Sequence, residues 1–171
     1  MADNLFAFMY WAMGNGEVAG EWPTPGGELV TGGSPRYNVY RTSDGKFVAA
    51  APLEQKFWEN FCALLGLAPD VQDDSRDAAK TRRAVADKIA SRTADEWRAL
   101  FAGKDVCCCI MASIEDALHD PHFVSRGVFL AKLAADGNEM TALPVPVAPQ
   151  FRARPESAGY PALGEANSLL K

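Results

Sequence analysis

Glu54 is the side chain in this sequence best suited to acid–base chemistry. Pro52 closes a run of β-prone residues and a helical pattern follows, so we predict Glu54 in the first turn of a helix. A carboxylate at a helix N-terminus is stabilised by the helix dipole and by free backbone amides, and it could act as a base. An acidic residue there could equally do no more than stabilise the helix, and the position alone leaves both interpretations open.

Two adjacent glycines, Gly32 and Gly33, precede Glu54 in a glycine-rich segment. They lack the strand-to-helix G-x-G-x-x-G setting of a dinucleotide site, but their loop could let a substrate approach the backbone closely. An ordinary turn is the alternative. Arg36 and Arg41 flank this loop and could meet a phosphate or carboxylate, or could have solvent-facing or cross-strand roles.

The cysteines and histidines do not predict a metal site or a disulfide framework. Cys107–Cys109 are consecutive and Cys62 stands alone, a pattern without C-x-x-C spacing. We predict the three consecutive cysteines in a buried strand, and reduced thiols favour a cytoplasmic location. His119 and His122 would need further ligands nearby to hold a metal, so we predict none.

Composition restricts the class of protein. The chain has 171 residues, 48% of them hydrophobic, which is enough for one sizeable core or two small ones in a globular protein. The net charge is −5, and no run of Lys and Arg is present. We therefore do not expect a nucleic-acid partner.

The first residues are unusually apolar. A helix over residues 3–13 is predicted from a cap at Asp3 or Asn4, with large apolar side chains on nearly every side. The apolar run is too short to cross a bilayer and lacks the features of a secretory signal, so no membrane association is expected. We interpret it as a buried helix that is covered by a preceding segment or by a second subunit.

Turn signals and hydrophobic periodicity predict an α+β fold. Seven glycines and three prolines in residues 14–36 predict a long loop without regular structure. The strongest signal is Asp44-Gly45, which is typical of a hairpin turn between two β-prone runs. The further elements predicted are the hairpin strands 37–42 and 46–51, a helix from residue 53 to Gly66, a helix over 76–91, a helix from the capping box Thr93–Glu96, a strand over 105–111, a cap at Ser113, a short helix in 120–127, a second hairpin of 128–134 with 140–144, and an extended tail with a weak helix after Gly164.

Three motifs carry a resemblance to a known family. They are Thr31-Gly-Gly-Ser-Pro-Arg-Tyr37, Tyr40-Arg-Thr-Ser-Asp-Gly-Lys46 and Ala51-Pro-Leu-Glu-Gln-Lys-Phe-Trp58. With later matches up to Pro161-Ala-Leu-Gly164, the chain resembles the class III CoA-transferase and α-methylacyl-CoA racemase family, also called CaiB/BaiF. The order and spacing of the motifs make the resemblance specific.

The resemblance implies a domain organisation. Members of that family have a large Rossmann-like domain and a smaller α+β domain, and two chains interlock as a homodimer. This chain resembles a linker helix and glycine loop (residues 1–33), the α+β small domain (34–143) and an extended return segment (144–171) towards an N-terminal large domain. We therefore expect the chain to be incomplete, and inactive alone, without that large domain.

The resemblance also implies roles for individual residues. Glu54 falls on the position of a glutamate that supports the catalytic His of racemases, in a motif like Ala-Ile-Glu-Pro-Gln-Phe, from which Pro52, Leu53 and Gln55 depart. Gly32 and Gly33 match a glycine loop that covers the thioester, and Arg36 is expected to bind substrate. The implied substrate is an acyl-CoA or CoA, with coenzyme A as a substrate moiety rather than a bound cofactor. The reaction would be CoA transfer or racemisation, an isomerase activity; the alternative is a non-catalytic acyl-CoA-binding or subunit-interaction module.

Overall fold

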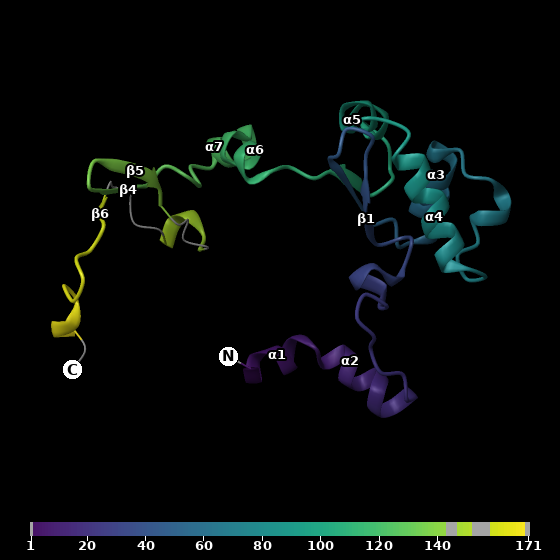
Figure 1. Ribbon diagram of the computed structural model, residues 1–171, viewed down its shortest axis with the longest axis horizontal. Coiled ribbons are helices and arrows are strands. Elements are labelled where there is room, and N and C mark those ends of the chain that lie inside the picture. The colour runs from purple at the N-terminus through teal and green to yellow at the C-terminus, as the bar shows by residue number, and fades with distance from the viewer. Residues whose placement is uncertain (1, 143–146, 152–157, 170–171) are drawn as a thin grey trace. The chain divides into compact units, whose positions relative to one another are not determined.

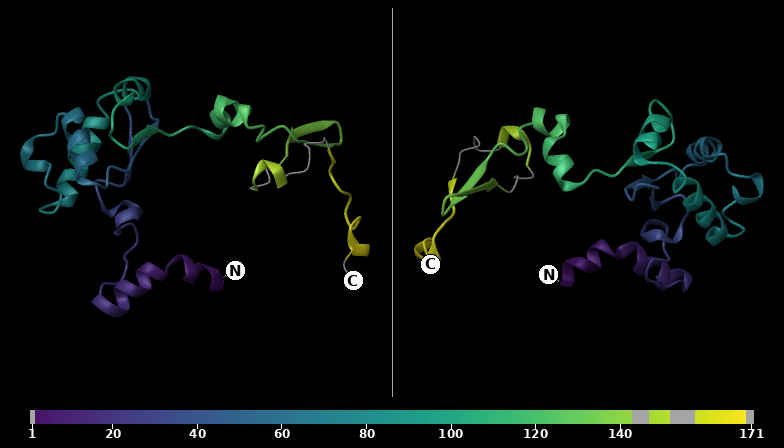
Figure 2. Two further views of the ribbon diagram at one scale, coloured as in Figure 1. Left: turned by 180° about the vertical axis from the view of Figure 1, so that it is seen from behind. Right: turned by 45° about the horizontal axis from the view of Figure 1, so that its top comes forward.

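The structure of the chain, a computed structural model, describes residues 2–142, 147–151 and 158–169. It forms two compact units, residues 1–111 and 112–171, and the course of the chain through each can be followed in Figures 1 and 2. The α+β class predicted from the sequence is confirmed by helices mixed with small, mainly antiparallel sheets. The predicted domain limits at residues 33 and 143 stay predictions.

The first unit contains a three-stranded antiparallel sheet in the order β1-β2-β3 and all of the helices that build the core. Its elements are α1 (Ala2–Phe8), α2 (Tyr10–Gly14), η1 (Asn15–Ala19), η2 (Leu29–Gly33), β1 (Asn38–Arg41), β2 (Phe47–Ala50), α3 (Gln55–Leu65), η3 (Pro69–Val71), α4 (Ala78–Ile89), α5 (Ala94–Phe101) and β3 (Cys108–Ile110).

The predicted first hairpin is confirmed, with Tyr40 opposite Val48 in the β1–β2 register. Gly45 takes a φ of +80° in the turn, a conformation that favours glycine. Because side chains alternate along a strand, Tyr40 and Val48 face the core while Val39 and Phe47 lie on the outer face and stay about half exposed.

The core lies between the inner face of this sheet and helices α3, α4 and α5. The predicted helix that ends at Gly66 is confirmed, and Gly66 has the left-handed conformation of a C-cap. Trp58 and Phe61 of α3 and Ile89 of α4 are almost completely buried. A Trp–Phe side chain pair on α5, Trp97 and Phe101, stacks with ring centroids 5.6 Å apart.

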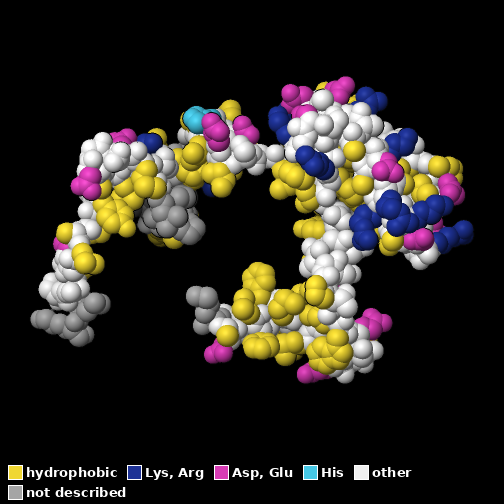
Figure 3. All heavy atoms as spheres, in the orientation of Figure 1, with side chains coloured by type: hydrophobic (Ala, Val, Ile, Leu, Met, Phe, Trp, Pro, Cys, Tyr) yellow, Lys and Arg dark blue, Asp and Glu magenta, His cyan; other side chains and the backbone are white. Residues whose placement is uncertain are grey.

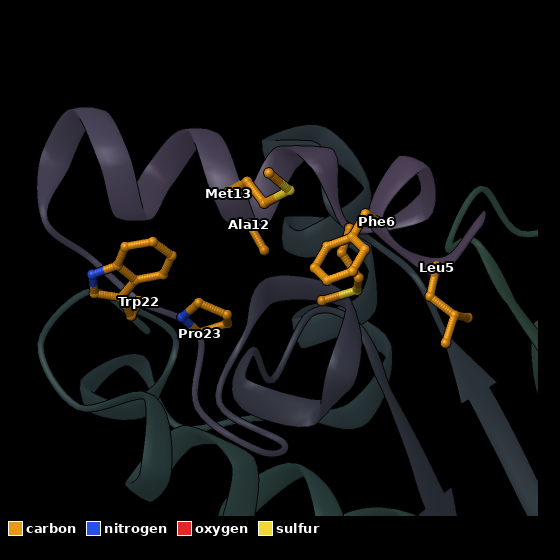
Figure 4. Close-up of a pocket in the computed structure, with 7 residues that line it drawn as sticks. Leu5, Phe6, Ala12, Met13, Trp22 and Pro23 are labelled. Carbon is orange, nitrogen blue, oxygen red and sulfur yellow. The ribbon is translucent and has the colours of Figure 1, made fainter. Parts of the chain in front are cut away.

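The prediction of one continuous helix over residues 3–13 is wrong, whereas its burial by a preceding segment or a second subunit stays a prediction. The helix breaks at Met9 (φ −97°, ψ 14°) into α1 and α2, and Ala12 is the one residue of these two helices that is buried. Apolar side chains surround both helices. The chain folds back against them around Trp22 and Pro23, where an apolar hollow of about 180 Å³ forms (Figure 4). Hydrophobic side chains therefore gather on the surface of this segment (Figure 3).

Two further predictions need correction. The loop over residues 14–36 is not free of regular structure, because it contains the π-helical turns η1 and η2, interrupted by glycines such as Gly20 (φ +74°). The strand prediction around the three cysteines is confirmed for Cys108–Ile110 alone, and it is not buried. Cys109 lies opposite Ala49 on the outer face of the sheet and is exposed, whereas Cys108 lies opposite the buried Ala50 and is half-buried. Cys107, just before the strand, is exposed.

The second unit has no buried residue in the part of it that the structure describes. The second predicted hairpin is confirmed, and its turn at Asp136-Gly137 has positive φ at both residues. A short parallel strand pairs with β4. The elements are α6 (Ile114–His119), α7 (Pro121–Ser125), β4 (Lys132–Ala135), β5 (Asn138–Thr141), η4 (Pro149–Phe151), β6 (Ala158–Gly159) and η5 (Asn167–Leu169). Much of the extended tail predicted from Pro144 lies outside the described residues.

Among the helices that the structure describes, none combines the length and the apolar character that a membrane span requires.

Candidate functional site

Glu54 lies at the start of α3, where the chain leaves the sheet. The backbone of Ala51 donates to the carbonyl of Cys107 over 3.0 Å, and Pro52 is fully buried, so the connection between β2 and α3 is firmly held. Glu54 has extended dihedral angles (φ −73°, ψ 144°), and its carbonyl accepts from Trp58 over 3.0 Å. It is therefore the N-cap residue, one position before the first turn in which we predicted it.

The carboxylate of Glu54 does not cap its helix. It makes no side-chain hydrogen bond to the first turn of α3, and the residue is exposed. The N-cap side chains of four other helices do accept such bonds; these residues are Asp77, Thr93, Ser113 and Asp120. The interpretation of Glu54 as a helix-stabilising residue is thus not supported by a capping bond.

The surroundings of Glu54 raise the pKa of the neighbouring thiol, Cys107. The pKa of Cys107 is raised by desolvation, and next by the negative charges of Glu54 and Asp105. Asp105 also pairs with Lys56 over 2.7 Å, and this hydrogen bond raises the pKa of the lysine. A cysteine nucleophile needs a lowered pKa, so Cys107 has no features of a catalytic thiolate.

The glycine pair forms a tight turn that only glycine can make. Gly32 has a φ of +109°, and a Cβ atom on Gly33 would lie 1.9 Å from the carbonyl oxygen of Gly27. The amide of Gly33 donates to the carbonyl of Glu28 over 3.0 Å. A side chain at Gly33 would force the loop to open, and at Gly32 it would strain the backbone.

Side chains from β1 and α4 hold the carbonyl groups of this loop. Arg82 Nη1 donates to the carbonyl oxygens of Gly32 (3.0 Å) and Gly33 (3.1 Å), and Asn38 Nδ2 donates to that of Gly32 (3.0 Å). The hydroxyl of Tyr40 donates to the carbonyl of Pro35 over 2.7 Å, and burial raises the pKa of this phenol. The loop is thus attached to the core of the first unit.

Arg36 lies between the glycine loop and Glu54. Its Nε and Nη2 atoms donate to the carboxylate of Asp74, with a closest approach of 2.7 Å, and its Nη1 donates to the carbonyl of Leu53 (3.4 Å) and to Oε1 of Gln55 (3.0 Å). The guanidinium carbon lies 5.0 Å from the centre of the Trp58 ring. The substrate-binding role of Arg36 stays a prediction, because all three nitrogens already have protein partners.

The three predicted site regions, the glycine pair, Arg36 and Glu54, are connected through Arg36, which binds the two residues beside Glu54. In the described part of the chain, no hydrogen bond or ion pair joins the Glu54 carboxylate to Gly32 or Gly33. Sequence reasoning missed Asn38, Arg82 and Asp74. Their polar side chains look like ordinary surface residues until the fold places them beside the loop.

The two histidines have local helical partners. His119 Nδ1 lies 2.9 Å from the carbonyl of Glu115, and His122 Nε2 lies 3.2 Å from Arg126. Across residues 2–142, 147–151 and 158–169, no group of three or more His, Cys, Asp or Glu side chains is placed to hold a metal ion.

Comparison with known proteins decides the family. The profile of CoA-transferase family III matches residues 1–167. The chain belongs to this family. The resemblance seen in the sequence is therefore confirmed.

The relatives include alpha-methylacyl-CoA racemases and a probable fatty acyl-CoA transferase, Rv3272 of Mycobacterium tuberculosis. The chain is 32% identical to the alpha-methylacyl-CoA racemase of Mus musculus over 151 residues, which cover 85% of this chain and 39% of the relative. It is 33% identical to the alpha-methylacyl-CoA racemase of Homo sapiens over 141 residues, 78% of this chain and 37% of the relative. The chain thus spans about two fifths of the length of the curated relatives it matches.

A solved structure supports the fold. The crystal structure of Rv3272 from M. tuberculosis matches with a TM-score of 0.55 at 21% identity, over 78% of this chain and 39% of that chain. This likeness supports the same arrangement of helices and strands in the matched part.

Proposed function

We propose that this chain supplies one wall of an acyl-CoA thioester site, in which Glu54 supports proton transfer at the α-carbon of the acyl group. The observation that carries this proposal is the carboxylate of Glu54, which is exposed at a helix N-terminus and unused as a cap. Membership of CoA-transferase family III and the two racemase relatives point to acyl-CoA as the substrate class.

The chemistry accounts for the residue types. Racemisation needs a base on one face of the α-carbon, an acid on the other, and donors that stabilise the enolate oxygen. In the proposed site Glu54 supports the base and the loop of Gly32 and Gly33 covers the thioester. The reacting groups come from the N-terminal large domain of the full-length protein, which we further propose to be a cytoplasmic homodimer and an isomerase. The share of the relatives that this chain spans supports the need for a second domain.

The test is proton exchange by the full-length protein. A 2-methylacyl-CoA is incubated with the protein in deuterated water, and deuterium at the α-carbon is followed by NMR, while CoA transfer to added carboxylic acids is followed in parallel. Deuterium incorporation without transfer supports the proposal. Transfer without incorporation would instead assign a CoA-transferase, for which a carboxylate attacks the thioester. Binding heat in calorimetry without either reaction would assign the non-catalytic alternative.

A further inference from the structure

Arg36 connects the glycine loop to both neighbours of Glu54. It follows Gly33 closely in the chain, yet its guanidinium reaches the backbone carbonyl of Leu53 and the side chain of Gln55. These two residues flank Glu54 directly. The side chain of Arg36 therefore connects the end of the glycine loop to the backbone that carries Glu54.

The guanidinium group itself is held in place on two sides. Asp74 accepts from both Nε and Nη2, in the two-pronged geometry that fixes an arginine most firmly. Trp58 packs against the guanidinium, is almost completely buried, and donates through Nε1 to the carbonyl of Gln72 over 2.8 Å. The side chains of Arg36 and Asp74 are only 18% and 17% exposed. Arg36 thus has little freedom to turn towards a ligand.

The surroundings of Arg36 do not suit an anionic ligand. A cleft of about 290 Å³ borders Arg36 and Gln55, and the acidic side chains of Glu59 and Asp73 also line it. A phosphate or carboxylate in that cleft would meet these negative charges, while Arg36 is already paired with Asp74. A rigid structural connection fits these contacts better than a contact with the substrate.

We propose that Arg36 is a positioning residue, which sets Glu54 at a fixed distance from the loop of Gly32 and Gly33. This inference rests on the proposed function, because it assigns Arg36 an effect on catalysis that passes through Glu54. It replaces the direct substrate contact expected from the sequence. A small displacement of a catalytic group can cost a large part of the rate.

The first experiment separates positioning from substrate binding. Arg36→Lys keeps a positive charge for Asp74 but cannot also reach Leu53 and Gln55. In the α-proton exchange assay of the full-length protein, we expect kcat to fall about tenfold while KM changes less than about twofold. A rise of KM with kcat retained would overturn the inference, since it would indicate a direct contact with the substrate. Arg76→Lys, in the exposed Arg76–Asp73 pair, is the matched control and should change neither constant.

The second experiment tests whether the effect passes through Glu54. In a Glu54→Gln background, Arg36→Lys should cause no further fall in the residual exchange rate, whereas independent effects would multiply. Multiplied losses would overturn the inference and leave the proposed function intact. Full exchange activity in Glu54→Gln alone would instead overturn the proposed function. If Arg36→Lys does not fold, Gln55→Ala serves instead, because it removes the hydrogen bond between Arg36 and the exposed side chain of Gln55. We expect kcat for exchange to fall about threefold in this variant, and this fall should also vanish in the Glu54→Gln background.

Discussion

The starts of α3 and α5 use their acidic side chains in opposite ways. At α5, Thr93 accepts from the amide of Glu96, and the carboxylate of Glu96 accepts from the amide of Thr93. Asp44 in the hairpin turn adds a bond from the amide of Ala94 over 3.1 Å. At α3, by contrast, the carboxylate of Glu54 makes no capping bond.

This difference shows that two helix starts attached to one sheet are held by different contacts. The start of α5 is held by its own capping box and by the hairpin turn, which is sufficient for a structural helix. The start of α3 is held instead by the buried Pro52 and by the contacts of Arg36 with Asp74, Leu53 and Gln55. With the helix start held by these contacts, the Glu54 carboxylate is not used as a cap, which is consistent with the role we propose for it.

The largest effect on stability is expected from the ion pair between Arg36 and Asp74, which supports the start of α3. Asp74→Ala would leave the guanidinium of Arg36 largely buried without its carboxylate, which should lower the free energy of unfolding by about 2 kcal/mol. Urea denaturation of this chain, followed by tryptophan fluorescence, measures the change. The control is Asp70→Ala, which removes the exposed pair with Lys80 and should lower the free energy of unfolding much less. Equal losses in the two variants would show that Arg36 does not hold α3.

An acid-dependent effect is expected at the start of α5. The hydroxyl of Thr42 donates to Asp44 over 2.6 Å and lowers the pKa of this carboxyl, assisted by the bond from Ala94. Because the folded pKa lies below the unfolded one, the stabilisation is present above about pH 4 and is lost as the pH falls through the folded value.

Asp44→Asn tests this sign, because an amide oxygen can still accept the same bonds but does not titrate. Thermal unfolding of the variant between about pH 2.5 and pH 7 should show a flatter decline on the acid side than the wild type. Part of the decline should remain, because the backbone amide of Thr93 also lowers the pKa of Glu96. An unchanged acid profile would mean that Asp44 does not contribute.

The smallest effect concerns the thiol beside Glu54. Because the negative charge of Glu54 helps to raise the pKa of Cys107, Glu54→Gln should increase the thiolate fraction at pH 8 and speed alkylation of Cys107 by about twofold. Peptide mass spectrometry after limited treatment with iodoacetamide measures the rate, with the exposed Cys109 as the reference. Cys62 should stay unmodified in both proteins, because burial raises its pKa to about 12. A slower reaction of Cys107 in the variant would show that the charge of Glu54 does not raise the pKa of this thiol.

Local signals were sufficient to predict most of the secondary structure. The Asp44-Gly45 turn, the Thr93–Glu96 capping box and the glycine at the end of α3 each depend on a few neighbouring residues, and each is present in the structure. The motif around Glu54 likewise located the candidate carboxylate. It could not show that the carboxylate is unused as a cap, because the N-cap and the first turn are one residue apart.

Long-range contacts were beyond the reach of the sequence. Arg36 and Asp74 are 38 residues apart, and Arg82 reaches Gly32 across 50 residues. The hydrophobic periodicity of the sequence does not predict contacts between residues so far apart in the chain. The exposure of Cys109 depended on the face of the sheet on which its side chain lies. The exposed apolar surface of α1 and α2 depended on which of the described segments pack against it. These features follow from the fold and not from composition.

The central claim is that the carboxylate of Glu54 is held available for thioester chemistry. Its most direct test compares α-deuterium incorporation into a 2-methylacyl-CoA by the full-length wild type and by Glu54→Gln. We predict an exchange rate about a hundredfold lower in the variant, because the proposed site uses this carboxylate in proton transfer. The melting temperature should stay unchanged, because the side chain makes no capping bond that the substitution would remove. Wild-type exchange by a correctly folded variant would contradict the account.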